Sequence, residues 1–370
     1  MNNSSLCAYH DPYTDFRFAV ISFCSLLSLL GVAASILLQL IFCRLEKKQD
    51  NKATSQLYLQ GLVFSDASFC FCFVWVFGLD ALALYLEVSW IFHLYFALLV
   101  PIFTLSRLVQ MSTPYFLIVA TLDKLTLSCV HRLGRRLNFF GRLVLSDPFR
   151  ITVTTAICIL SLILRLPSLW AYEVEFFPNC SDVFGTKQLH PTWLAADPLF
   201  IVFNFYLTNL LGVFLPFLLL LLINLAIVRN VRLEIDQLRR ERKQQINFAI
   251  TAISFPMARK RACVVNDGKR DILDQRNSLA RREMKSNLIT MTVLISSFLL
   301  CHAPHLILTF LEQFYPAALF TQRSVPRSFY LVWSDSVSLF KMLSSFSRFI
   351  IFYLCNRDVR NEVKNMISRP

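Results

Sequence analysis

Residues 199–228 read LFIVFNFYLTNLLGVFLPFLLLLLINLAIV, a stretch without a single Asp, Glu, Lys or Arg. The hydrocarbon core of a bilayer is about 30 Å thick, so a helix needs roughly 20 apolar residues to cross it. Within lipid, every backbone polar group must be hydrogen-bonded inside such a segment. This stretch therefore predicts a membrane-spanning helix.

Six further apolar runs flank it, and together they predict an all-α integral membrane protein: a seven-transmembrane helix bundle with a short amphipathic helix after helix seven. The runs cover about 17–43, 55–80, 92–125, 151–172, 199–228, 287–312 and 328–355. Pro101, Arg107 and Gln110 interrupt the third run, where two short re-entrant segments are the alternative to the preferred single tilted helix.

Composition agrees with a membrane class. The chain has 370 residues, of which 55% are hydrophobic and only 16% charged, so too little polar surface remains for a water-soluble globule of this size. The net charge of +13 would also suit a nucleic-acid binder. Here, however, the Lys and Arg residues lie between the apolar runs, the pattern of membrane topology, so no nucleic-acid partner is expected.

The basic segments predict the orientation. Most Lys and Arg residues lie in 44–52, 124–150, 229–285 and the tail after Cys355, which should be cytoplasmic. Acidic residues and glycosylation acceptor sites lie in the opposite segments: Asp80, Glu87, Glu173, Glu175, Asp182 and Asp197, with acceptors at Asn2, Asn3 and Asn179. We therefore expect a multi-pass plasma-membrane protein with residues 1–16 extracellular.

Two cytoplasmic segments have readings of their own. The basic segment 229–286 is either a solvated loop or a pair of helical ends that extend helices five and six toward a partner. In the tail 356–370, Val359, Val363, Met366 and Ile367 share one face, which predicts a short amphipathic helix on the inner leaflet.

Only Cys7 and Cys180, among 11 cysteines, fall in segments predicted to be extracellular. A disulfide between them is the simplest pairing, because the other cysteines lie in apolar runs or cytoplasmic loops. Free thiols at both positions, or a different topology, remain the alternatives.

Three stretches resemble the rhodopsin-like G-protein-coupled receptors, and the resemblance extends along nearly the whole chain. They are FLLCHAP at 298–304, FLPFLLLLLINLAIVRNVR at 214–232 and LVFSD at 62–66. FLLCHAP is similar to that family's Cys-Trp-x-Pro element, with His302 in place of Trp. Pro304 removes a backbone donor and kinks the helix, so the resemblance implies a hinge there.

The third run ends with ATLDKL, which is similar to the family's Asp-Arg-Tyr element, carried here by Asp123, Lys124 and Leu125. The resemblance implies an extracellular ligand, outward movement of helix six and coupling to a heterotrimeric G protein. Within the family, RLPSLW at 165–170 and SRFIIFYLCNRDVR at 347–360 look most like invertebrate, nematode FMRFamide-type neuropeptide receptors, with nematode chemoreceptor-like proteins as the nearest rivals.

The chain departs from the family pattern at several positions. RFIIF at 348–352 stands where the family has Asn-Pro-x-x-Tyr, and family-like packing would bring Arg348 near Asp66. We expect these two to form a direct ion pair in place of the usual sodium site, because opposite charges in mid-membrane are least costly together. Lys124 lacks the planar fork of the family's Arg, and Phe352 lacks a hydroxyl, so coupling is expected to be weak.

The family's outer disulfide is also impossible, because IFHLYFALLVP at 91–101 contains no Cys. This leaves Cys7 as the candidate partner of Cys180.

A ligand would enter between the outer halves of helices three, five, six and seven. The polar residues predicted there are Ser106, Arg107, Gln110, His302, His305, Gln313, Trp333 and Asp335, each of which also has a purely structural reading. Arg107 is the sharpest candidate, because a charge inside a membrane run needs a partner or a wet cavity. The cation of an amidated peptide ending in Arg-Phe would need an outer acid: Asp335, Glu312, Glu173 or Glu175.

Other functional classes fit less well. A transporter would need discontinuous helices and matched halves, which the seven runs do not provide. No G-x-S-x-G, H-E-x-x-H or P-loop pattern occurs, and the six histidines have no metal-ligand spacing, so no enzyme activity, catalytic residue, cofactor or metal is expected. A non-signalling or chemosensory receptor with the same fold remains an alternative, because of Lys124 and Arg348.

Overall fold

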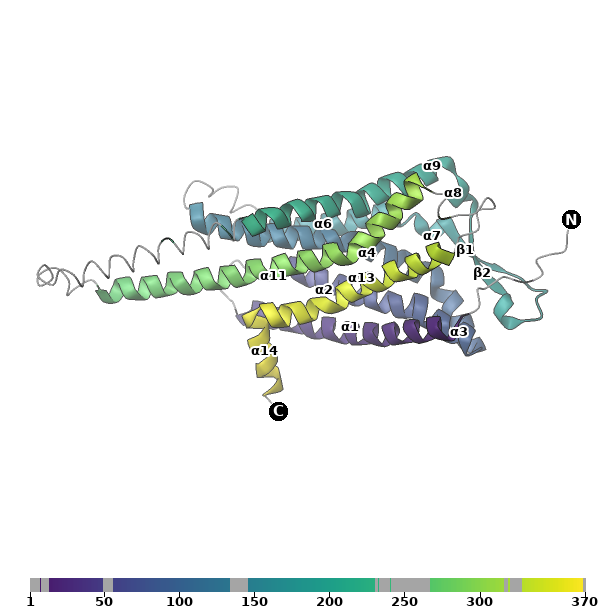
Figure 1. The fold of residues 1–370 in the computed structure, drawn as a ribbon, viewed down its shortest axis with the longest axis horizontal. Helices are drawn as coiled ribbons and strands as arrows, with labels where there is room; N and C mark the ends of the chain where they lie inside the picture. The colour runs from purple at the N-terminus through teal and green to yellow at the C-terminus, as the bar shows by residue number, and fades with distance from the viewer. Residues whose placement is uncertain are drawn as a thin grey trace, which may run out of the picture.

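Seven helices in the structure, a computed structural model, are long and apolar enough to cross a membrane. The structure describes residues 7, 13–48, 56–133, 146–229, 232, 240, 267–315, 319 and 328–368. Its helices confirm the predicted fold class, and the chain is a seven-span membrane protein. Figure 1 shows an elongated bundle with the strands β1 and β2 at one end and α14 at the other, here called the hairpin end and the α14 end.

The first three spans are α1 (Asp15–Lys48), then α2 (Leu57–Phe73) continued by the π-helical η1 (Val74–Leu79) and α3 (Asp80–Tyr85), and α4 (Ser89–Leu133). The fourth comprises α6 (Asp147–Arg165) and the short α7 (Ser168–Ala171). The approach to the fifth passes through α8 (Trp193–Ala196), α9 (Pro198–Ile201) and the π-helical η4 (Val202–Leu207) and η5 (Leu210–Phe214), before helical residues 215–229. The last elements are α11 (Asp267–Phe314), α13 (Ser328–Cys355) and α14 (Arg357–Ile367).

Two helices settle questions that the sequence left open. α4 is one continuous helix through Pro101 and Pro114, so the preferred reading of the third run is confirmed. α11 begins at Asp267, 20 residues before the predicted start at 287, and projects past its neighbours at the α14 end (Figure 1). Hydropathy could not detect this extension, because its residues are polar helix formers rather than apolar ones.

The sequence analysis did not anticipate a β-hairpin between the fourth and fifth spans. β1 (Tyr172–Phe176) pairs antiparallel with β2 (Lys187–Pro191), so that Tyr172 lies opposite Pro191 and Phe176 opposite Lys187. The 3-10 turn η3 (Val183–Gly185) lies between the strands. Two strands of five residues are too short and too polar to stand out against the adjoining apolar runs.

The helices bury one face against each other and turn the other outward. α1 packs against α2 and α13, α2 against α4, and α11 against α13. The largest core cluster lies among them and includes Leu62, Leu117, Leu294 and Phe352. Leu300 of α11, by contrast, is 77% exposed. Outward-facing apolar side chains of this kind suit contact with lipid tails, where no water has to be ordered around them.

The second span packs closely against α1 at a glycine. A Cβ at Gly78, within η1, would lie 2.7 Å from the hydroxyl oxygen of Ser25 on α1. Such a distance is an overlap, so a larger residue at 78 would require the Ser25 side chain to move.

α14 leaves the end of α13 crosswise to the bundle (Figure 1). Asn356 caps it, with its side-chain oxygen accepting from the backbone N–H groups of Asp358 and Val359. Val359 and Val363 are buried against the bundle, while Ile367 is exposed. The predicted amphipathic helix after the seventh span is therefore confirmed.

Candidate functional site

A cavity of about 610 Å³ lies between the helices toward the hairpin end. This volume is within the range of small-molecule binding sites in proteins. Its lining draws on five spans, on η4 at the approach to the fifth span and on β1. The contributions include Phe69 of α2, Phe103 of α4, Arg165 of α6, Asn204 of η4, His305 of α11, Ser338 of α13 and Tyr172 of β1. The chain therefore surrounds one space with side chains from segments far apart in sequence.

Part of this lining is aromatic. Phe69, Phe73 and Phe77 project from successive turns of α2 and η1 into the cavity. Phe103 of α4 joins them, and the guanidinium carbon of Arg107 lies 5.0 Å from the centre of its ring. The aromatic rings provide an apolar surface beside a cation.

Three cations line the same cavity: Arg107, Arg165 and Lys341, each within a membrane span. Lys341 Nζ donates to Gln110 Oε1 at 3.0 Å, and Arg165 Nη1 donates to Thr208 Oγ1 at 3.3 Å. Arg165 Nε is buried without a hydrogen-bond partner. Within the described residues, no carboxylate forms an ion pair with any of the three cations.

Local structure explains how Arg165 reaches the cavity. It is the last residue of α6, where the chain turns before α7 begins. Its guanidinium reaches the π-helical η5 of the fifth span, where a Cβ at Gly212 would lie 3.2 Å from Arg165 Nη2. Because Gly212 has no side chain, the Arg165 guanidinium has room beside the fifth span.

Glu312 is the acidic residue among the described lining residues. Tyr330 Oη donates to its Oε1 at 2.9 Å, which joins the ends of α11 and α13. Burial, together with the negative charge of Glu312, raises the pKa of Tyr330 to about 12. The phenol therefore stays protonated at neutral pH and remains a donor to the carboxylate.

A smaller cavity of about 40 Å³ lies next to the first, farther from the hairpin end. Six polar residues line both: Arg107, Gln110, Arg165, Asn209, His305 and Lys341. His302 faces only the smaller cavity; its Nδ1 is 3.0 Å from the carbonyl oxygen of Phe298, and the two rings stack at 3.8 Å. The cations thus lie at the junction of the two spaces.

Trp333, predicted as a ligand contact, is not among the residues that line either cavity. Its indole Nε1 donates to the carbonyl oxygen of Pro304 at 3.1 Å, so it links α13 to the proline turn of α11. Gln313 lies in the last turn of α11, and its side chain is outside the described part of the structure.

Asp335, another predicted ligand contact, already has a partner. Its Oδ2 lies 3.0 Å from Arg17 Nη2 at the start of α1, and the residue does not line the cavities. Glu173 and Glu175 are exposed on β1. Packing of α1 against α13 thus gives Asp335 an arginine partner, while the role of an outer acid as the anchor for a ligand cation stays a prediction.

Asp66 and Arg348 are in direct contact, with Asp66 Oδ1 2.5 Å from Arg348 Nη1 and both side chains about 3% exposed or less. The contact joins α2 to α13. The guanidinium carbon also lies 5.9 Å from the ring centre of Phe298 on α11, and Arg348 Nη2 has no hydrogen-bond partner. Arg348 of α13 therefore contacts both α2 and α11.

A second buried ion pair lies nearer the α14 end. Arg150 Nη2 of α6 is 2.9 Å from Asp123 Oδ1 of α4, and both side chains are buried. Lys124, next along α4, is half-buried. Phe352 of α13 packs edge-on against Phe42 of α1 at 5.3 Å between ring centres. Asp123 is thus paired with a different helix rather than left free beside Lys124.

No protein-family model matches the chain, and neither does any curated protein sequence. The arrangement of cavity, cations and ion pairs therefore has to carry the functional interpretation. Within the described residues, no group of three or more His, Cys, Asp or Glu side chains is placed to hold a metal ion.

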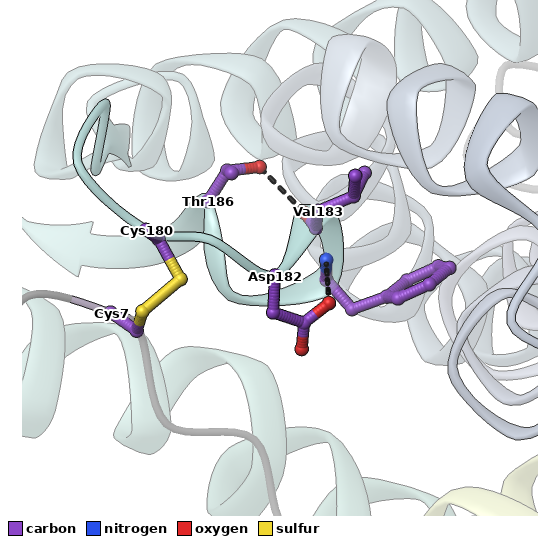
Figure 2. Close-up of a disulfide and its surroundings, with 6 residues drawn as sticks. Cys7, Cys180, Asp182, Val183 and Thr186 are labelled. Atoms are coloured by element: carbon purple, nitrogen blue, oxygen red, sulfur yellow. Dashed lines mark hydrogen bonds between the residues drawn. A yellow bond between two sulfur atoms is a disulfide. The ribbon is translucent and has the colours of Figure 1, made fainter.

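The hairpin end carries the disulfide between Cys7 and Cys180, shown in Figure 2. It ties the segment before α1 to the turn between the strands. Asp182 and Thr186 steady this turn, the first by accepting from the Phe184 N–H and the second by donating to the Val183 carbonyl. Asn179 is exposed next to Cys180. The other predicted glycosylation sites, Asn2 and Asn3, lie outside the described residues.

Arg165 and Lys341 are the charged cavity residues, among those described, that the sequence analysis missed. Lys341 is the lone Lys in the seventh apolar run, so the rule that flagged Arg107 applied to it equally. Arg165 lies at the end of the fourth run, where a basic residue is easily taken for a helix terminus.

Proposed function

We propose that this chain is a receptor of the rhodopsin-like G-protein-coupled kind, which binds an extracellular ligand in the cavity and signals to a heterotrimeric G protein at the α14 end. The observation that supports it most is the cavity itself, because one helix, α11, both lines it through His305 and Glu312 and runs unbroken to the far end. A contact made by a ligand can thereby move a surface on the other side of the membrane.

The proposed orientation puts the hairpin end outside the plasma membrane. In its favour are the disulfide and the exposed acceptor Asn179 at that end, since disulfides and N-glycans belong to oxidising, extracellular compartments. The basic segments around α14 and the start of α11 would then face the cytoplasm.

Pro304 provides the moving part of this mechanism. It lies within α11 between the cavity-lining His305 and the Arg348 contact at Phe298, and a proline interrupts the backbone hydrogen bonds of its helix. Trp333, which lies on α13, donates a hydrogen bond to the carbonyl oxygen of Pro304. A ligand that displaces α13 relative to α11 would therefore act on the hinge, and the helix beyond it would swing outward.

A non-signalling receptor is the second candidate, and two observations favour it. Lys124 replaces an arginine that reaches the G protein in receptors of this kind, and the buried Asp66–Arg348 pair links α2 to α13 in the core. Both would favour binding without output.

One screen separates the candidates. Cells that express the chain with a promiscuous G protein are exposed to a peptide library and, in parallel, to a library of small organic acids, with second-messenger concentration as the readout. We expect a saturable response that Arg107→Gln abolishes although this variant still reaches the cell surface. Binding at the cell surface without any response would support the non-signalling receptor instead.

A further inference from the structure

Three cations inside the membrane region need an explanation. A single Lys or Arg at the centre of a membrane helix is costly to insert, and buried charges are normally paired. The fully buried cations Arg150 and Arg348 follow this rule, since each contacts a carboxylate. Arg107, Arg165 and Lys341 do not, although all three line one cavity.

The hydrogen-bond partners of the cavity cations are neutral, unlike the carboxylates that pair with Arg150 and Arg348. Lys341 is held by the Gln110 amide and Arg165 by the Thr208 hydroxyl, groups that orient a cation without neutralising it. The carboxylate of Glu312 already accepts from Tyr330. The cavity therefore retains an excess of positive charge, and Arg165 Nε is a buried donor without an acceptor in the described part of the protein.

We infer that the ligand is a small organic anion, whose carboxylate or phosphate head group binds between Arg107, Arg165 and Lys341. This inference rests on the proposed receptor function and names the chemistry of its ligand. Guanidinium groups bind these oxyanions through paired hydrogen bonds, and the ammonium adds a point charge. The Arg165 Nε that lacks a partner in the protein is one of the donors available to such an oxyanion.

The aromatic part of the cavity suits the remainder of such a ligand. Phe69, Phe73 and Phe77 line the same space of about 610 Å³ as the cations. A ligand with its acid group at the cations would place an apolar body against these rings, and burial of that body would add to affinity. An amidated peptide end offers no such anion, so this chemistry differs from that implied by the FMRFamide-type resemblance.

Matched acids and amides test the inference. The full chain is purified in nanodiscs of neutral lipid, and its thermal unfolding midpoint is followed while 3-phenylpropionate or 3-phenylpropionamide is added. Phenyl phosphate tests the other head group, and Arg-Phe with a free carboxylate or as the amide tests whether a peptide end can supply the anion. We expect acids to raise the midpoint saturably and the amides to leave it unchanged.

Variants then locate the response. Arg107→Gln and Lys341→Met should each weaken the acid response about tenfold or more, because each removes a charge-assisted hydrogen bond. Lys364→Met is the matched control, since this exposed lysine of α14 lies at the other end of the bundle. In the absence of any ligand, Lys341→Met should raise the unfolding midpoint, because it replaces an unpaired buried charge with an apolar side chain.

The contrary results are equally specific. The inference is overturned if the amides stabilise the protein as well as the acids, if no anion of the series has any effect, or if Lys341→Met lowers the midpoint of the empty protein. Because no G protein is present, anion binding without cellular signalling would refute only the receptor proposal. If an amidated peptide elicits signalling and the acids have no effect, only the inference that the ligand is an anion is refuted.

Discussion

At the scale of residues, the buried charges in the described part of the chain are of two kinds: those paired with an opposite charge and the cations of the cavity, which are not. Asp66 and Arg348 neutralise each other, as do Asp123 and Arg150. An ion pair of this kind need not stabilise a protein more than apolar side chains would, but an unpaired half is expensive because its partner's charge stays buried. Paired charges therefore have a structural role, and the unpaired cations of the cavity are left to interact with a ligand.

The Asp66–Arg348 pair predicts a strong non-additive effect. Arg348→Met should destabilise the protein by about 3–5 kcal/mol, because it leaves the Asp66 carboxylate buried without a cation. The double variant Asp66→Leu, Arg348→Met should recover most of the loss. Thermal unfolding in detergent and surface expression measure both, with exposed Arg357→Met as the control. Losses that simply add would show that the two side chains act independently.

Replacing Lys124 by arginine should increase the second-messenger response. If the residue at this position inserts into the G protein, Lys124→Arg should raise the second-messenger response severalfold, because a guanidinium presents a planar set of donors where the ammonium is a point charge. Lys364→Arg on α14 makes the same chemical change at another site at this end. Equal output from Lys124→Arg and the wild type would remove Lys124 as the reason for weak coupling.

The cost of a charge in lipid was the sequence rule that singled out individual buried residues. Arg107 was identified because it interrupts an apolar run, and Asp66 and Arg348 because each is a lone charge in mid-membrane. Lys341 met the same criterion. Asp335 could not be judged this way, since its partner Arg17 lies 318 residues away and only the packing of α1 on α13 brings them together.

At the scale of elements, the apolar runs predicted the spans but not what joins them. Each span is continuous enough in hydropathy to be found from composition alone. The hairpin of β1 and β2 and the π-helical segments η1, η4 and η5 depend on local backbone geometry, which a hydropathy pattern does not contain. These irregular segments lie at the hairpin end, close to the cavity.

If Pro304 is a hinge in α11, a variant without the proline should separate ligand binding from signalling. Pro304→Ala should restore the backbone hydrogen bond that proline removes and stiffen the helix, so ligand binding should persist while signalling falls strongly. Ligand-induced stabilisation and second-messenger output, measured on the same variant, give the two quantities. Pro101→Ala in α4 is the matched control, because it removes a proline from another long span. Normal output from Pro304→Ala would exclude the proline hinge.

α14 predicts a local loss of helix stability. Asn356→Ala should destabilise the helix by about 1 kcal/mol, because it removes the side-chain oxygen that accepts from the Asp358 and Val359 amides. Amide hydrogen exchange across α14 should then be about fivefold faster. Asn365→Ala, an exposed position on the same helix, is expected to change exchange little. Equal exchange in both variants would mean that the cap is not what holds the helix.

At the scale of the whole molecule, polarity is reversed relative to a water-soluble bundle. Apolar side chains such as Leu300 and Phe64 face outward, while carboxylates and guanidinium groups are buried between helices. Lipid accounts for the first, and the pairing of opposite charges accounts for most of the second. The cavity lies toward the hairpin end and a long helix leaves the bundle at the α14 end, and the receptor proposal assigns ligand binding to the first end and signalling to the second.

The sidedness of these two faces tests the receptor account most directly. Epitopes are placed before residue 1 and after residue 370, and sealed right-side-out plasma-membrane vesicles that carry the chain are treated with protease. The account predicts that the amino-terminal epitope is lost and the carboxyl-terminal epitope survives until the vesicles are opened. Loss of both from sealed vesicles, or protection of both, would contradict seven spans and remove the basis for a receptor.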